Sequence, residues 1–433
     1  MAAISRELSG RLSDHFVDRT DVQSRRDRRL RVSAARLIGC LGELKGAFAK
    51  AGQFLSLRHD IVPPELRDAL GSLQDRVPPL PLASIREVVE SELGRPLADC
   101  FPRFDPTPLG AASIAQVHRA RLPDGGDVAV KVQYPWIAAS LPADLALLRL
   151  ALGLWLRFGG TGSRGVDVDV LFTEFAAGLQ EELDFEREGR VAGEIAANLG
   201  SDPQILVPEI HPDYSSRRVL TMSYHPCVSV NDCEGLERLG VSPEAVLEVL
   251  TRAYAKQVFV DGLFHADPHP GNLFVVDEPR ASETPRVLFV DFGLSKQLSP
   301  ELRDQMRQGI YAVLQRDLDA FMERMSDMEM IAPGAEAGVR AAVAGMFERI
   351  AGAGGQAGVL GSSGEQILSL KDEAKRLLQD TPGLQLPNDL LLYAKTLSYL
   401  FALGQEIAPS VDLMKLSLPY LLRFLAGLPA RAS

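Results

Sequence analysis

The sequence has few cysteines and no long apolar run, and both absences narrow the class of protein. Its cysteines are scattered, without a CxxC pair or a metal-ligand spacing, at Cys40, Cys100, Cys227 and Cys233. We therefore expect no disulfide framework, and a reducing compartment. A membrane-spanning helix needs about 18 apolar residues, but the nearest stretch, residues 145–158, contains two arginines. The first residues also lack the apolar run of a secretory signal, so the prediction is a cytoplasmic protein.

Positive charge is in the minority. Lys and Arg total 46 against 57 Asp and Glu, which makes the formal net charge −11. A chain with no overall attraction for phosphate backbones is not expected to bind nucleic acid. The exception is local, because residues 1–36 contain nine Arg against five acidic residues. This arm is either a solvated helix or a weak peripheral contact with an anionic membrane surface.

Three segments with different patterns follow one another along the chain. Residues 1–82 carry apolar positions at helical spacing and end in a proline cluster, VPPLPL. Residues 83–223 contain two β-branched runs around PDGG, which predict a hairpin, and then a helical stretch. Residues 224–433 are mostly helical, interrupted by the strand-like runs NLFVV and RVLFV. A small sheet-bearing unit followed by a helical one predicts an α+β fold with two lobes around a ligand-binding cleft.

A polar constellation in the last segment carries the strongest chemical signal. FHADPHPGN contains His265, Asp267 and Asn272, and VLFVDFGLS follows with Asp291. These match the H-x-D-x-x-x-x-N loop and the D-F-G of phosphoryl-transfer enzymes. Asn272 and Asp291 offer the hard oxygen ligands that suit Mg²⁺. A bare D-F-G occurs by chance in about one chain in fifteen, but the loop, the strand and their order together are specific.

Upstream, VAVK places Lys131 at the end of a strand, where the V-A-I-K lysine of kinases holds nucleotide phosphates. Its expected partner is a glutamate on the helix that we expect to begin near residue 170. That helix carries an acidic run, GLQEELDFEREGR, and such a run is most often a solvated face. Spacing alone does not choose among its members, which are Glu181, Glu182, Asp184, Glu186 and Glu188.

Two features of ordinary protein kinases are missing from the sequence. The stretch before the second strand is LGAASIAQVH, so the G-x-G-x-x-G loop is replaced by residues 110–113, which contain one glycine. Fewer glycines predict a stiffer loop around the nucleotide. No Ala-Pro-Glu follows Gly293, so the segment that positions peptide substrates is absent or replaced. Residues 299–301, Ser-Pro-Glu, instead predict the immediate start of a helix.

In this order, PLGAASIAQVHRA, VAVKVQYP, EELDFEREG, HADPHPGN and VDFG resemble the UbiB-type (AarF-like) atypical protein-kinase-like family. FAKAGQFLSLRHDIVPPEL is similar to that family's K-x-G-Q segment, with Lys50 and Gln53 on one helical face. The resemblance extends over about residues 35–420. It implies a bilobal protein-kinase-like fold with a helical N-terminal extension over the active-site cleft. The sequence departs from the family at Gly110, which replaces an alanine, and at Ser223, where an acidic residue is common.

The resemblance implies a role for each matching position. Asp267 is the catalytic aspartate, Glu188 is the ion-pair partner of Lys131, and Asn272 and Asp291 hold Mg²⁺. Contacts with the nucleotide come from the alanine-rich loop, the strand lysine and the hinge, namely Gly110, Ala111, Ala112, Ser113, Lys131, Met222 and Tyr224. A regulatory lid, in which the K-x-G-Q helix faces the E-x-D pair, consists of Lys50, Gln53, Glu182 and Asp184.

We therefore predict an atypical kinase or ATPase that binds Mg·ATP and, as the family implies, serves isoprenoid quinone or lipid metabolism. Its further partners are a quinone precursor or lipid and a membrane surface as a peripheral contact. Two alternatives stay open. One is a small-molecule kinase of the aminoglycoside- or choline-phosphorylating type, against which the K-x-G-Q helix and the alanine-rich loop count. The other is a non-catalytic scaffold that binds ATP to change conformation, which the full set of catalytic groups disfavours.

Overall fold

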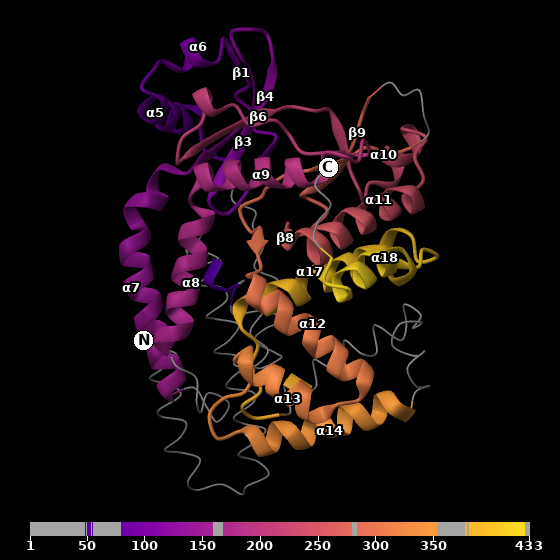
Figure 1. The fold of residues 1–433 in the computed structure, drawn as a ribbon. Helices are drawn as coiled ribbons and strands as arrows, with labels where there is room; N and C mark the ends of the chain where they lie inside the picture. The colour runs from indigo at the N-terminus through magenta and orange to yellow at the C-terminus, as the bar shows by residue number, and fades with distance from the viewer. Residues whose placement is uncertain are drawn as a thin grey trace, which may run out of the picture. The chain divides into compact units, whose positions relative to one another are not determined.

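The computed structural model describes residues 48, 50–52, 54, 79–158, 168–278, 284–352, 377–378 and 381–428. Its contacts divide the chain into two compact units, whose elements are drawn in Figure 1. The first unit comprises residues 1–123 and 130–183, and the second comprises residues 124–129 and 184–433. The domain boundaries expected at residues 82 and 223 are not tested by this division and stay a prediction.

Most residues of a small antiparallel sheet belong to the first unit. β1 (Arg103–Phe104) and β2 (Gly110–Ala111) both pair with β3 (Ala115–Arg121), and β3 is the neighbour of β4 (Asp127–Gln133). The turn between β3 and β4 is PDGG, so the predicted hairpin is confirmed. The helices of this unit are α5 (Leu82–Leu93), α6 (Leu97–Cys100), α7 (Pro135–Phe158) and α8 (Val168–Glu182).

Strand β4 is buried on both faces. Val128, Val130 and Val132 alternate along it and are each completely buried, as one face of a strand packed on a core should be. On the opposite face Lys131 and Gln133 are also buried. The amide nitrogen Nε2 of Gln133 donates to the carbonyl oxygen of Leu183 at 2.7 Å, which satisfies one of its polar atoms. Lys131 and Gln133 therefore lie inside the protein.

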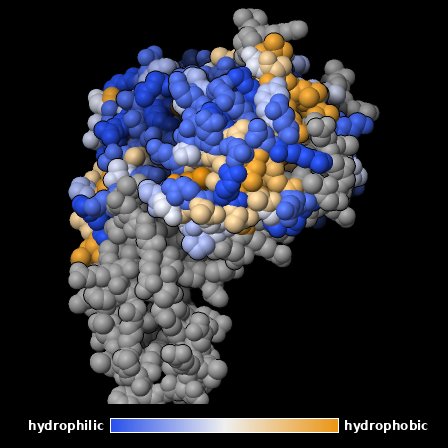
Figure 2. Space-filling view, turned by 60° about the horizontal axis from the view of Figure 1, so that its bottom comes forward, coloured by the Kyte–Doolittle hydropathy of each residue, from blue (hydrophilic) through white to orange (hydrophobic). Residues whose placement is uncertain are grey.

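Apolar side chains are also found on the surface. On α7, Leu147 and Leu150 are exposed by 52% and 59%. The described face in Figure 2 is mainly hydrophilic, with apolar side chains gathered in patches. Within the described part of the chain, every helix is too short or too polar to cross a membrane.

The second unit contains two further sheets. In the larger, β10 (Val287–Phe289) lies between β5 (Ile205–Leu206), which is parallel to it, and β9 (Leu273–Val276), which is antiparallel. β9 also pairs with β7 (Cys227–Ser229). The smaller sheet joins β8 (Leu263–Phe264) to β11 (Lys296–Gln297). β9 and β10 confirm the strands predicted in NLFVV and RVLFV. β6 (Val219–Ser223) confirms the strand predicted in RRVLTMSY.

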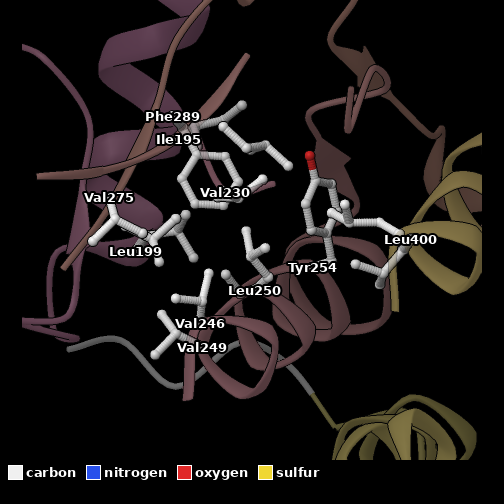
Figure 3. Packing of buried hydrophobic residues seen from close by; sticks show 14 of the residues in the cluster. Ile195, Leu199, Val230, Val246, Val249, Leu250, Tyr254, Val275, Phe289 and Leu400 are labelled. Carbon is white, nitrogen blue, oxygen red and sulfur yellow. The ribbon is translucent and has the colours of Figure 1, made fainter. Parts of the chain in front are cut away.

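The helices of the second unit bury the core shown in Figure 3. Ile195 comes from α9 and Leu250 from α11, and they pack with Val275 and Phe289 of the sheet. The helical elements are α9 (Phe185–Leu199), η2 (Pro212–Tyr214), α10 (Cys233–Arg238), α11 (Pro243–Ala255), the π-helical turn η3 (Lys256–Asp261), α12 (Pro300–Gln315), α13 (Leu318–Asp327), α14 (Glu336–Gly352), α17 (Asn388–Ile407) and α18 (Leu413–Leu425). α12 begins as predicted, because the hydroxyl of Ser299 accepts a hydrogen bond from Leu302 N at 3.1 Å.

The acidic run lies on two helices, so the expectation of a single helix was wrong. α8 ends at Glu182 and α9 begins at Phe185. Asp184 is the N-cap of α9: its backbone is extended, and its carboxylate accepts a hydrogen bond from Arg187 N at 2.9 Å. An aspartate that satisfies an unpaired N–H in this way starts a new helix. Glu182 and Asp184 therefore lie at a helix end and at a cap, and share no helical face.

Candidate active site

The loop between β8 and β9 folds back on its own backbone. The carbonyl oxygen of Asp267 accepts a hydrogen bond from His269 N at 2.7 Å, and that of His269 accepts one from Asn272 N at 2.8 Å. The side-chain nitrogen Nδ2 of Asn272 then donates to Asp267 Oδ2 at 3.0 Å and to Asp267 O at 3.2 Å. The structure thus brings together the predicted catalytic aspartate and one predicted metal ligand.

The orientation of the Asn272 amide follows from its partners. Both atoms of Asp267 that contact it are acceptors, so the amide group directed at them must be the nitrogen. The amide oxygen is consequently the atom that remains for a cation. The backbone carbonyl oxygen of Asn272 accepts a hydrogen bond from Val290 N at 3.0 Å. This bond connects Asn272 to the residue between β10 and Asp291.

Asp291 has a strained backbone conformation. Its φ is 62°, in the left-handed region that residues other than glycine seldom adopt. His265 Nε2 lies 2.8 Å from the carbonyl oxygen of Asp291 and 3.1 Å from that of Val290. Phe292 is buried. Its ring lies edge-on to that of His265, with 5.4 Å between the ring centres. Such strain persists only where surrounding contacts impose it, and it is common at functional sites.

Buried neighbours determine which nitrogen of His265 carries a proton. Carbonyl oxygens only accept, so Nε2 is the donor. Nδ1 lies 3.1 Å from the hydroxyl of Tyr254, which donates to it. Burial, with a smaller contribution from the charge of Asp267, raises the pKa of Tyr254 well above its usual value, so this hydroxyl keeps its proton. In Figure 3 the ring of Tyr254 packs in the core beside α11, and its oxygen points away from that helix.

The chemistry of the donors fits Mg²⁺. Among the described residues there is no group of three or more His, Cys, Asp or Glu side chains that could enclose a metal. Mg²⁺ is usually held by one or two protein oxygens together with phosphate oxygens and water, so a closed protein cage is not needed. The carboxylate of Asp291 and the amide oxygen of Asn272 form such a small set of hard ligands.

Sequence reasoning missed two basic residues that contact this region. Lys395 of α17 places its Nζ 3.1 Å from Asp267 Oδ1. Arg187 of α9 donates to the carbonyl oxygen of Gly293, the last residue of the D-F-G, at 3.4 Å, and to that of Ser295 at 3.3 Å. Each contact joins residues more than a hundred positions apart. No local spacing in the sequence could have indicated them.

Two charged residues of the candidate site are buried. Lys131, in the first unit, is 8% exposed, and Glu188, in the second unit, is 1% exposed. A charge buried to this degree needs a compensating charge, hydrogen bonds or a metal ion. Glu186, another member of the acidic run, is exposed. Burial therefore separates Glu188 from the solvated face to which an acidic run usually belongs.

The alanine-rich loop is a tight turn between β2 and β3. Ala112 N donates to Ala115 O at 2.8 Å, and Tyr134 N donates to Ile114 O at 2.9 Å, so the turn is held at both sides. The hydroxyl of Ser113 is buried and has no hydrogen-bond partner among the described residues. A buried hydroxyl without a partner needs an explanation, and a phosphate oxygen would supply one.

The predicted hinge residues lie around the end of β6. Met222 is buried and forms an isolated β-bridge with Ile210. The backbone N–H of Tyr224 donates to Asp127 O at 3.0 Å. Their contacts with a nucleotide stay a prediction.

The first unit brings together part of the predicted regulatory lid. Lys50 forms an ion pair with Glu182, and each side chain is 14% exposed. Phe54 is also helical, and the centre of its ring lies 5.4 Å from the centre of the Phe175 ring on α8. Gln53 lies outside the described residues, and Asp184 is the N-cap of α9.

Comparisons with known proteins agree with these observations. Residues 72–325 match the ABC1 atypical kinase-like domain. A "Probable protein kinase UbiB" of Marinobacter nauticus is 33% identical over 396 residues, which cover 89% of this chain and 69% of that protein. "Protein ACTIVITY OF BC1 COMPLEX KINASE 8, chloroplastic" of Arabidopsis thaliana is 37% identical over 288 residues, 66% of this chain and 37% of that protein.

Among solved structures, the complex of Rv3197 with erythromycin from Mycobacterium tuberculosis is similar to this chain. It is 23% identical, with a TM-score of 0.51, and the match covers 90% of this chain and 99% of that one. At this identity the likeness shows the fold alone. The predicted α+β, kinase-like fold is confirmed.

Proposed function

The chain belongs to the ABC1 atypical kinase-like family, and on this premise we propose that it is an Mg²⁺-dependent ATPase or phosphotransferase acting on a small molecule or lipid. The observation that carries the proposal is the hydrogen-bonded pair of Asp267 and Asn272, together with the strained backbone of Asp291. A carboxylate and metal ligands held on rigid backbone are what phosphoryl transfer requires.

Asp267 accepts the proton of the attacking water or hydroxyl in this proposal. The oxygen of that group forms a bond to the γ-phosphorus, while the bond from phosphorus to the β,γ-bridging oxygen breaks and ADP leaves. Asn272 and Asp291 hold Mg²⁺, which neutralises charge on the phosphate oxygens when it is bound. Lys131 binds the phosphates with Glu188 as its partner, and Gly110, Ala111, Ala112 and Ser113 cover them.

The acceptor is proposed from the family resemblance and the lid residues. A quinone precursor or another lipid is the proposed ligand, and a membrane surface is the proposed peripheral contact. The ion pair of Lys50 with Glu182 supports a fixed lid, because it fastens the K-x-G-Q segment to α8. We therefore expect negligible transfer of phosphate to a generic protein substrate.

Three variants test the assignment of the site. Asp291→Asn removes an anionic ligand and should abolish the rise in melting temperature that Mg·ATP gives. Asp267→Asn should keep that rise but lower the rate of phosphate release at least about 100-fold. Asp277→Asn, at an exposed position after β9, is the matched control and should behave as wild type. Phosphate release is measured without lipid, and with vesicles of phosphatidylcholine containing phosphatidylglycerol.

Two results would contradict the proposal in different ways. If Mg·ATP stabilises Asp291→Asn as well as wild type, the metal assignment is wrong. If wild type binds Mg·ATP but releases no phosphate under either condition and labels no lipid, the non-catalytic scaffold is the correct interpretation.

A further inference from the structure

Lys395 reaches the carboxylate of Asp267 from a helix 128 residues away in the sequence. Its Nζ lies 3.1 Å from Asp267 Oδ1, and the two side chains are only 15% and 26% exposed. The other carboxylate oxygen, Oδ2, accepts the hydrogen bond from Asn272. We propose that Lys395 is a positioning residue for Asp267, which holds Oδ1 while Asn272 holds Oδ2, so that the carboxylate keeps one orientation.

The loop itself cannot supply this positive charge. Between Asp267 and Asn272 the sequence is Pro-His-Pro-Gly, without lysine or arginine. A carboxylate withdrawn from water is costly unless an opposite charge or strong donors compensate it. An ammonium group is a donor only, and a carboxylate is an acceptor, so the contact at Oδ1 is a charge-assisted hydrogen bond. Lys395 thus provides the charge that this loop lacks.

The position of Lys395 is determined by the contacts of α17. The ring of Tyr393 meets that of Phe264 edge-on at 6.1 Å, and Phe264 is the last residue of the strand before the loop. Asp389, at the start of α17, pairs with Lys296 at 3.0 Å, and Lys296 is the partner of Phe264 in the β8–β11 sheet. The helix that carries Lys395 is therefore attached to both strands of this small sheet.

An aromatic side chain holds the lysine on the helix side. The Nζ of Lys395 lies 5.3 Å from the centre of the Tyr399 ring, one turn along α17, within the range of a cation–π contact. The ammonium group is thereby held between a ring and a carboxylate. Such bracketing reduces the orientations open to a long side chain, which suits a residue that orients another group.

The consequence for catalysis rests on the proposed function. A group that accepts a proton must face the attacking atom, and a misplacement of about 1 Å can cost 100-fold in rate. Lys395→Met keeps the length of the side chain and removes its charge. We expect kcat for ATP hydrolysis to fall about 10- to 100-fold, with KM for ATP changed less than about threefold. Lys395→Arg should recover part of the loss, and Lys415→Met, an exposed lysine on α18, should change neither constant.

A double-mutant cycle with Asp267→Asn tests whether Lys395 acts through Asp267. Residues that act as a unit have non-additive effects. In the Asp267→Asn background, Lys395→Met should therefore lower kcat much less than it does in wild type. The same four proteins are melted without nucleotide, because this second measurement does not need activity. Lys395→Met should lower the melting temperature of wild type, where it removes the positive charge from Asp267 Oδ1, and lower it less in the Asp267→Asn background.

The two measurements separate the possible failures. If wild type hydrolyses ATP and Lys395→Met leaves kcat unchanged or raises it, the positioning role is overturned. If wild type does not hydrolyse ATP, the proposed function fails, and the melting cycle decides about Lys395. Additive changes in melting temperature would then show that Lys395 does not hold Asp267, whereas coupled changes would support the contact.

Discussion

Backbone conformation and available space constrain Asp291 and Gly110 of the candidate site to different degrees. Asp291 has a φ of 62°, a conformation that costs on the order of 1 kcal/mol outside glycine, and contacts from His265 hold it there. Gly110 is different, because its φ is not in the left-handed region and a Cβ added to it would meet no heavy atom within 4 Å. The glycine in the alanine-rich loop is therefore not required by backbone or by space.

Replacing Gly110 with alanine should stabilise the protein. Gly110→Ala reduces the freedom of the unfolded chain and meets no obstacle, so the free energy of unfolding should rise by about 0.4–1 kcal/mol in urea denaturation. Gly235→Ala is the control, since its Cβ would lie 2.8 Å from Cγ of Asp232, the N-cap of α10. That change should lower stability by about 0.5–2 kcal/mol. A loss of stability in Gly110→Ala would show that the loop needs glycine.

At the scale of elements, a polar network fastens β3 to the segments around it. His118 is completely buried, with Nδ1 2.8 Å from Asp105 O and Nε2 2.7 Å from Gln116 Nε2. The carbonyl can only accept, so Nδ1 carries the proton and Nε2 accepts from Gln116. Gln116 also pairs with the backbone of Leu80, before α5. The network is satisfied only while His118 is neutral.

This network predicts a loss of stability in mild acid. Burial lowers the pKa of His118 below its usual value, although its bond to Asp105 opposes the shift. The unfolded chain therefore binds a proton more readily as pH falls below about 6.5. The contribution of His118 should be intact above about pH 6.5, and it should be lost as the pH falls from that value to the lowered pKa of the folded state. Urea midpoints between pH 8 and pH 5 measure this, and His118→Gln should show a smaller decline. An equal decline in both proteins would contradict the prediction.

At the scale of the whole molecule, the two compact units each hold part of the predicted site. Lys131 and the alanine-rich loop belong to the first, and Glu188 belongs to the second with Asp267 and Asp291. Lys131 and Glu188 are buried charges, and both are proposed to serve the nucleotide. Combined substitutions at both positions measure whether the two residues act as a unit.

The effects of Lys131→Ala and Glu188→Ala on nucleotide handling should be similar and non-additive. If the two residues serve one function, the double variant is little worse than either single variant. Binding of Mg·ATP, followed by thermal shift, and the rate of phosphate release are the measurements. Glu186→Ala, at an exposed position of the same helix, is the control, and its small effect should add to that of Lys131→Ala. Fully additive losses for Glu188→Ala would mean that Glu188 is the wrong partner.

Features that depend on neighbours along the chain were determined by the sequence alone. The PDGG hairpin, the strand after Asn272, the strand before Asp291 and the start of α12 after Ser299 all follow from alternation or from hydrogen bonds within a few residues. The break between α8 and α9 also had a local signal, the capping Asp184, which the acidic run around it concealed. The resemblance of motifs supplied the family.

Only the tertiary structure decided the contacts that join distant segments. It placed Lys395 on Asp267 and Arg187 on the backbone at the end of the D-F-G, and it buried Glu188 while Glu186 stayed exposed. The physical reason is that a long polar side chain on a helix has the same sequence pattern whether it faces water or a carboxylate. Its partner is chosen by the packing of whole elements, here by the attachment of α17 to β8 and β11, and no local pattern encodes that choice.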